Sequence, residues 1–196
     1  VAANNYATAL GYNIANSGEG SVAIGKRVNV DKSFATTIGY HQNTTGNASA
    51  SVNIGYQSTV KANQSVGLGS TINIEDKAQY STAIGYKAKT LDKNAIAIGS
   101  SNDQSEVIAG GESSIAIGTS AQAKANHSVA IGTSAKVLGG QGSVAIGWGT
   151  ELGENEVTLS NKVPDAQKTY AYLLHKSSED AANDAGNGIV AIGKKR

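Results

Sequence analysis

Hydrophobic and small or polar residues alternate in short runs along most of the chain. A five-residue pattern of small, apolar, small, apolar and Gly recurs, as in residues 21–25 with the sequence SVAIG. Alternation with a period of two is typical of a β-strand, whose successive side chains point to opposite faces. Val22 and Ile24 therefore share one face, and we expect that face to be buried. Ser21 and Ala23 lie on the other face, which we expect to be exposed.

The pattern occurs eleven times and always ends on glycine. Half of the intervals between successive glycines are 14 residues long, and the longer intervals of 15, 16, 19 and 46 residues indicate insertions. A fixed period of this kind predicts a solenoid built from stacked copies of one unit. The repeat glycines, which we interpret as structural, are Gly11, Gly25, Gly39, Gly55, Gly69, Gly85, Gly99, Gly118, Gly132, Gly147 and Gly193.

Each unit holds a second alternating run, with inward positions three and five residues after the glycine. Val28 and Val30, or Ile72 and Ile74, occupy these positions. Two short strands and two turns make one flattened coil, so the sequence predicts an all-β, two-sided parallel β-roll, roughly 45 Å long at about 4.8 Å per coil. The core is thin, and the exposed face of small residues favours covering by self-association, in a number of copies that the period does not give.

Composition and motifs argue against catalysis, cofactors and metals. The chain has no Cys and a net charge of +1, so thiolate chemistry is excluded and no strong field attracts nucleic acid. His41, His127 and His175 stand in unrelated contexts, and we interpret them as solvated loop residues. Serines recur at one repeat position, which indicates strand structure and not a nucleophile: Ser21, Ser51, Ser65, Ser114, Ser128 and Ser143. We therefore expect that the protein is not an enzyme.

Half of the aromatic residues follow the repeat glycine directly. These five residues are Tyr12, Tyr40, Tyr56, Tyr86 and Trp148. One interpretation is that the rings pack over the turn between the two strands of each coil. The other is that Tyr40, Tyr56, Tyr86 and Trp148 form a receptor-binding stripe, because Tyr and Trp are favoured anchors at protein interfaces.

Insertions break the period in three main places. Five extra residues lie within residues 100–112, and two each lie between Gly39 and Gly55 and between Gly69 and Gly85. We expect these loops at one corner of the roll. Loops often carry binding residues, which makes Asn102, Asp103 and Glu106 candidates for receptor contact. A tolerated polar insertion explains them equally well.

The chain divides into a roll over residues 1–160, an insertion over 161–188 and a final repeat strand over 189–196. Apolar spacing from Asp165 to Ala185, after Pro164, predicts a helix in the insertion. This helix would cap the roll, lock a neighbouring chain or meet a receptor. The sequence shows neither a membrane span nor a signal pattern, so if the protein is exported we expect its signal and anchor in other parts of a longer protein.

The repeated SVAIG at 14-residue spacing, followed by G-x-x-A-x-A or a similar run in residues 118–123 and 132–137, resembles the YadA-like head of trimeric autotransporter adhesins. The resemblance covers residues 7–152 and resumes at 189. It implies a left-handed parallel β-roll, three chains side by side as a homotrimer, and a head carried outward on a coiled-coil stalk.

The same resemblance implies a function at the bacterial cell surface, with an anchor in the outer membrane. The head would bind a host matrix protein (collagen, fibronectin or laminin) or a host receptor such as a CEACAM-type immunoglobulin-like protein, through multivalent contacts. It implies no cofactor, no nucleic-acid partner and no membrane contact of the head itself. The alternative is a structural spacer or phage-fibre segment of similar trimeric β architecture without its own ligand.

Overall fold

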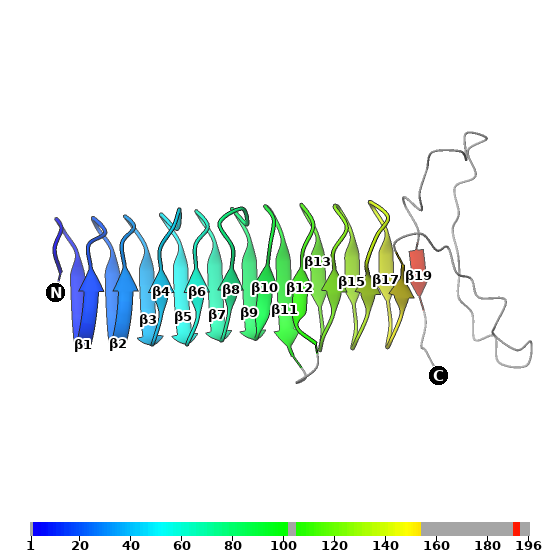
Figure 1. The fold of residues 1–196 in the computed structure, drawn as a ribbon, viewed down its shortest axis with the longest axis horizontal. Coiled ribbons are helices and arrows are strands. Elements are labelled where there is room, and N and C mark those ends of the chain that lie inside the picture. Colours follow the sequence, from blue (N-terminus) through cyan, green and yellow to red (C-terminus); the bar gives the residue numbers. More distant parts are fainter. Residues whose placement is uncertain (1, 102–104, 154–189, 193–196) are drawn as a thin grey trace, which may run out of the picture.

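The chain forms a parallel β-solenoid of about ten turns. The computed structural model describes residues 2–101, 105–153 and 190–192. Within these residues the fold is all-β, without a helix. Successive coils stack along one axis, so the strands form two facing parallel rows along a straight rod (Figure 1). The predicted two-sided parallel solenoid is confirmed.

Each coil contributes a first strand, which contains the repeat glycine or ends just before it, and a second strand. β1 (Thr8–Asn16) and β2 (Val22–Val30) run through both strands of a coil without a break. The first-strand row continues with β3 (Thr36–Tyr40), β5 (Val52–Tyr56), β7 (Val66–Ser70), β9 (Thr82–Tyr86), β11 (Ile96–Ser100), β13 (Ile115–Ile117), β15 (Val129–Ile131), β17 (Val144–Ile146) and β19 (Val190–Ile192). The second-strand row continues with β4 (Asn43–Thr44), β6 (Thr59–Val60), β8 (Asn73–Ile74), β10 (Ala88–Thr90), β12 (Val107–Ala109), β14 (Gln122–Ala123), β16 (Lys136–Val137) and β18 (Glu151–Leu152).

Equivalent residues of neighbouring coils pair in register. Gly11 pairs with Gly25, and Gly25 with Gly39. Each repeat residue therefore lies directly above its own equivalent, so a side chain of one kind forms a ladder along the rod. The register also crosses the five-residue insertion after Gly99, because Ala97 still pairs with Ala116.

In the first strand, the buried face is the opposite of the one that the sequence predicts. Ala23 and Ala97 are fully buried, whereas Val22 and Ile24 lie half-buried on the outer face. The prediction that the Val and Ile face points inward is therefore wrong. The second strands fill the interior with large side chains such as Val30, so the facing first strands have room only for small ones. The prediction that residues such as Val28 and Val30 point inward is confirmed.

Serine side chains join successive coils inside the roll. The Ser51 hydroxyl donates a hydrogen bond to the Ala62 carbonyl oxygen at 2.8 Å and accepts one from the Ser65 backbone N–H at 3.2 Å. Ser65 repeats the arrangement, because its hydroxyl accepts a hydrogen bond from the Ser81 N–H at 3.3 Å. A buried polar group is tolerated when it is hydrogen-bonded in this way. The structural interpretation of the repeat serines is confirmed for these coils.

Two edges of the rod are formed by the turns. We call the turns between the first and second strand of each coil the tyrosine edge, which includes residues 11–13, 25–27 and 39–42. The turns between one coil's second strand and the next coil's first strand form the opposite edge. At each edge one non-glycine residue of most coils has left-handed backbone, such as Arg27 (φ 57°) at the tyrosine edge and Phe34 (φ 59°) at the opposite edge. This conformation turns the chain sharply without a long loop.

The insertions lie at both edges, so the expectation of one corner is wrong. The two-residue insertions lie in residues 45–50 and 75–80, at the opposite edge, because the strands on either side keep their register. The five-residue insertion lies at the tyrosine edge. There, Ile84 and Ala88 are four residues apart, whereas their partners Ile98 and Val107 are nine apart. Spacing between glycines measures the length of an insertion but does not say which of two turns holds it.

The predicted helix over residues 165–185 and the whole insertion over 161–188 lie outside the described residues. Beyond them, β19 pairs in parallel with β17, and Ala191 aligns with Ala145. In the part of the chain that the structure describes, no helix has the length and apolar character needed to span a bilayer.

Candidate functional site: the tyrosine edge and the outer apolar face

The residues that follow the repeat glycines form one ladder along the tyrosine edge. Backbone pairing aligns Tyr12 with Lys26, Lys26 with Tyr40, and Tyr40 with Tyr56. The alignment continues from Tyr56 through Ser70 and Tyr86 to Ser100. The sequence-predicted candidates Tyr40, Tyr56 and Tyr86 are therefore brought together on one side of the rod.

The backbone of this edge is already hydrogen-bonded between coils. The His41 N–H donates to the Lys26 carbonyl oxygen, the Gln57 N–H to Tyr40, and the Lys87 N–H to Ser70, each at 2.9 Å. Another strand cannot pair with N–H groups that are already bonded, so a ligand of this edge must contact side chains.

Ring stacking and cation–π contacts order the ladder. The Tyr40 and Tyr56 rings stack with centroids 5.4 Å apart and an interplanar angle of 12°. The Lys26 ammonium lies 5.9 Å from the Tyr12 ring centroid and 5.8 Å from that of Tyr40. Such contacts contribute about 0.5–1 kcal/mol each at exposed sites. In the N-terminal coils these side chains therefore contact their equivalents in neighbouring coils, and the choice between packing and receptor binding stays a prediction.

The same side chains keep much of their surface in solvent. Tyr12 is 69% exposed, Tyr56 48% and Tyr86 39%, and Trp148 of a later coil is 50% exposed. Packing within the ladder therefore leaves a large part of each of these side chains accessible. Packing and binding are compatible for these residues.

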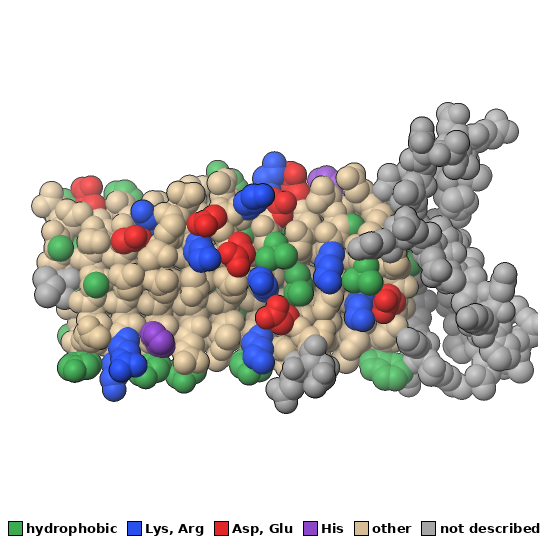
Figure 2. Space-filling view, in the orientation of Figure 1, with side chains coloured by type: hydrophobic (Ala, Val, Ile, Leu, Met, Phe, Trp, Pro, Cys, Tyr) green, Lys and Arg blue, Asp and Glu red, His purple; other side chains and the backbone are tan. Residues whose placement is uncertain are grey.

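Positive charge accompanies the rings. Lys26, Arg27 and Lys87 all lie at the tyrosine edge, and His41 lies beside Tyr40, with ring centroids 6.0 Å apart. Within residues 2–101, every acidic residue lies at the opposite edge: Glu19, Asp31, Glu75, Asp76 and Asp92. Figure 2 shows basic, histidine and hydrophobic side chains together along the lower edge of the N-terminal half. The sequence analysis missed the cations, although Lys26 occupies the same repeat position as the tyrosines.

The remaining candidates are placed less completely. Glu106 is exposed just before β12, in the coil that carries the five-residue insertion at the tyrosine edge. Asn102 and Asp103 lie outside the described residues. The two described histidines, His41 and His127, are exposed in turns, as the sequence predicts.

Half-buried aliphatic side chains cover the outer face of the first-strand row. In most coils two of them point outward, such as Ile96 and Ile98 in β11. A face of stacked Val, Leu and Ile differs from the outer face of the second-strand row. There, the aligned residues include Asn43, Thr59 and Asn73. A contiguous apolar face of this kind marks an interaction surface.

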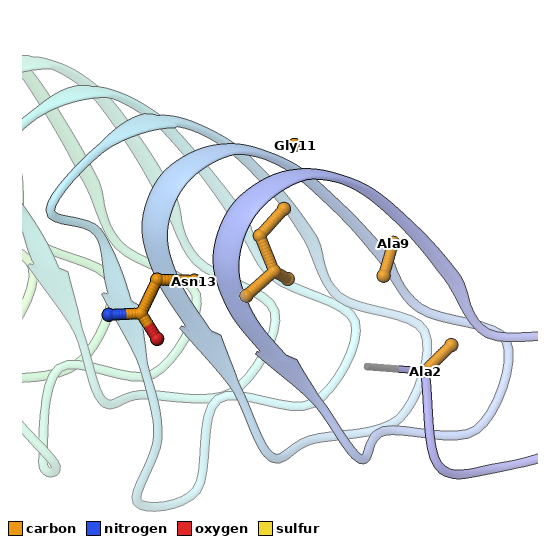
Figure 3. A pocket seen from close by; sticks show the side chains of 5 residues that line it. Ala2, Ala9, Gly11 and Asn13 are labelled. Carbon is orange, nitrogen blue, oxygen red and sulfur yellow. The ribbon is translucent and has the colours of Figure 1, made fainter.

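A cavity of about 370 Å³ lies at the N-terminal end of the rod, where the first coil opens (Figure 3). Its lining residues are Ala2, Ala9, Gly11, Asn13 and Ile14, none of which titrates. It offers no group for acid–base chemistry. Across the residues that the structure describes, no group of three or more His, Asp or Glu side chains is arranged to hold a metal ion.

Comparison with known families identifies the repeat. Residues 77–102 and 109–135 match the family model of the YadA head domain repeat, as two copies. The first copy contains β9, β10 and β11, and the second contains β13, β14 and β15. No curated protein sequence matches the chain. YadA head repeats on a β-solenoid are characteristic of adhesin-type, non-enzymatic heads of the cell surface. The chain is therefore a parallel β-solenoid in which residues 77–102 and 109–135 are similar to the YadA head domain repeat.

Proposed function

We propose that this chain is the head of a bacterial surface adhesin that binds host matrix proteins or cell-surface receptors. The observation that carries the proposal is the pair of YadA head domain repeats within one continuous solenoid. The full-length protein would be anchored in the outer membrane and would hold this rod away from the cell. Its ligands would be collagen, fibronectin, laminin or a CEACAM-type receptor.

The active unit in this proposal is a homotrimer. The outer face of the first-strand row supports self-association, because Val, Leu and Ile side chains recur there coil after coil and stay half-exposed in the single chain. Burying such a face is favourable by about 25 cal/mol per Å². Three copies would pack these faces towards a common axis and leave both edges of each chain outside.

The tyrosine edge is the ligand surface in this proposal. It presents Tyr12, Tyr56 and Tyr86 partly exposed on a rigid backbone, so little conformational freedom is lost when they bind. Trimerisation would repeat the edge three times on one rod. Three weak contacts that engage a multivalent matrix together bind much more tightly than one.

The test is binding of the purified protein to immobilised collagen, fibronectin, laminin and a CEACAM-type receptor, measured by biolayer interferometry. We expect at least one ligand to bind, and the double variant Tyr56→Ala/Tyr86→Ala to weaken binding by about tenfold, typical of two interface tyrosines. Phe34→Ala/Tyr80→Ala is the matched control, because these side chains are 67% and 57% exposed at the opposite edge.

Two outcomes would count against the proposal. Absence of binding to every ligand would favour a spacer without its own ligand. If the two double variants weaken binding equally, the ligand does not bind specifically at the tyrosine edge. The adhesin function would still stand in that case.

A further inference from the structure

The charge at the tyrosine edge differs in kind from the charge elsewhere on the rod. Several lysines elsewhere pair with carboxylates of the next coil, as Lys61 does with Glu75 at 3.1 Å and Lys93 with Glu112 at 3.0 Å. Lys26 lies between two tyrosine rings, and no acidic residue among residues 2–101 belongs to this edge. Lys26 and Arg27 therefore present positive charge that no carboxylate of this edge within residues 2–101 neutralises, whereas Lys87 is aligned beside the exposed Glu106 of the next coil.

The shape of the edge restricts the ligand. The edge is a straight ridge of in-register turns, and the cavity in the described residues lies at the N-terminal end of the rod. A bonded backbone rules out strand addition, and a ridge has no pocket for an anchoring side chain. A ligand that fits is a long chain that lies along the ridge and presents anionic groups and hydroxyls at intervals.

We propose that the tyrosine edge from Tyr12 to Lys87 binds a linear sulfated polysaccharide. The proposal rests on the adhesin function above and names the chemical class of one of its ligands. Lys26 and Arg27 would hold one sulfate group, and Lys87 would hold a second, four coils further on, at a distance of roughly 19 Å given about 4.8 Å per coil. Tyrosine hydroxyls and the His41 imidazole between them would hydrogen-bond sugar hydroxyls.

The rings support this class of ligand over an acidic peptide. Tyr40 and Tyr56 stack on each other, and Lys26 lies between the Tyr12 and Tyr40 rings, so each of these rings has at least one face in contact with a protein group. Exposed hydroxyls and cations complement a polymer of hydroxyls and sulfates. A peptide would add apolar side chains and backbone amides, for which the ridge offers neither a pocket nor a free strand edge.

The test measures binding of a heparin-derived dodecasaccharide to the purified full chain by isothermal titration calorimetry. We expect binding that weakens with added salt, because exposed charge contacts are screened. The double variant Lys26→Gln/Arg27→Gln should weaken binding by roughly tenfold, the upper range for two exposed ion pairs. Arg27→Gln keeps the fold, because Gln57 and Gln64 already adopt the same left-handed backbone in this chain.

The matched control is Lys77→Gln/Lys124→Gln, which removes two exposed lysines from the opposite edge. Its affinity should stay within about twofold of the unaltered chain, since exposed charges beyond a Debye length contribute little.

Tyr12→Phe/Tyr56→Phe removes hydroxyls without removing rings. We expect it to weaken dodecasaccharide binding and to leave the thermal unfolding temperature unchanged.

Four outcomes would overturn the proposal: no binding, equal weakening by the two lysine variants, equal binding of the desulfated dodecasaccharide, or tighter binding of a polyglutamate peptide of the same charge. If one of these outcomes is found but the chain still binds collagen, fibronectin, laminin or the receptor, the adhesin function is still supported. Loss of that binding with retained dodecasaccharide binding would instead count against the protein ligands alone.

Discussion

At the scale of single residues, the repeat glycine is required by the stacking of coils. Gly85 has a φ of +121°, a conformation that side chains with a Cβ rarely adopt, and a Cβ there would overlap the carbonyl oxygen of Gly99 in the next coil. The same overlap recurs at Gly25 and Gly39. In-register stacking brings each glycine onto the next, so a larger residue at one coil disturbs two.

We predict that Gly85→Ala destabilises the chain by about 3 kcal/mol or more, because backbone overlap and left-handed strain act together. Gly67→Ala is the matched control. There the added Cβ would meet only methyl groups, Val60 Cγ2 at 2.9 Å and Ile72 Cγ2 at 3.2 Å, and the next coil carries Ala83 at the aligned position. We expect a cost of about 1 kcal/mol for this control. Urea denaturation followed by circular dichroism measures both, and equal costs would contradict the explanation.

A second residue-scale prediction concerns Glu75. The hydrogen bond from Lys61 lowers the pKa of this carboxyl from its ordinary value of 4.5, and a hydrogen bond from Asn73 adds to the effect. A lowered folded-state pKa contributes stability above the ordinary value, and that stability is lost as pH falls through the lowered pKa. A third of the Glu75 side chain is exposed, which limits the contribution to about 0.5 kcal/mol.

Glu75→Gln should therefore lower the free energy of unfolding at neutral pH and have almost no effect well below the lowered pKa of Glu75, where both side chains are neutral. Urea denaturation across this pH range checks the expectation. Asp76→Asn, at the exposed neighbouring residue, controls for loss of one negative charge. A Glu75→Gln effect that stays constant with pH would mean that the ion pair is not its cause.

At the scale of strands, the sequence predicts the period, both strands of each coil and the inward residues of the second strand. It does not predict which face of the first strand is inside. Alternation in Val22, Ala23 and Ile24 defines two faces, but the choice between them depends on the space that Val28 and Val30 leave in the same coil. Only packing of both rows together settles that question.

The candidate site is also predictable only in part from the sequence. The position after the glycine identified the tyrosines, because repetition in sequence becomes alignment in space. Lys26 was overlooked because a single cation in a repeat position has no pattern of its own. Left-handed backbone at residues such as Arg27 and Phe34 is also invisible in the sequence, since Gly or Asn usually marks that conformation.

The inward position of the first strand gives a direct prediction. Ala97 is fully buried between the aligned Ala83 and Ala116, so Ala97→Leu should destabilise the chain by about 3 kcal/mol through overpacking. Ile98→Leu changes the half-buried outer neighbour and should cost less than about 1 kcal/mol. Thermal unfolding of the two variants compares them. A larger effect at Ile98 would restore the original assignment of the faces.

At the scale of the whole molecule, substitutions on the outer apolar face should change how many chains associate without changing the fold of each chain. We predict that Ile84→Ser/Ile98→Ser lowers the mass measured by light scattering from three chains to the 19.9 kDa of one chain. The strand content should be unchanged, because both side chains point out of the coil. Ile108→Ser, on the outer face of the second-strand row, should leave the trimer intact. A single chain at every concentration of the unaltered protein would contradict the homotrimer.

The in-register stacking also gives the rod a constant rise per coil. Five extra residues between β11 and β12 leave Ala97 aligned with Ala116, so turns lengthen without disturbing the pitch. The length of the rod therefore depends on the number of coils, and one more copy of the unit would lengthen it by about 4.8 Å. Duplication of a 14-residue segment would thus change how far from the cell a ligand is met. Substitutions along one edge would change which ligand it is, and neither change would require a new fold.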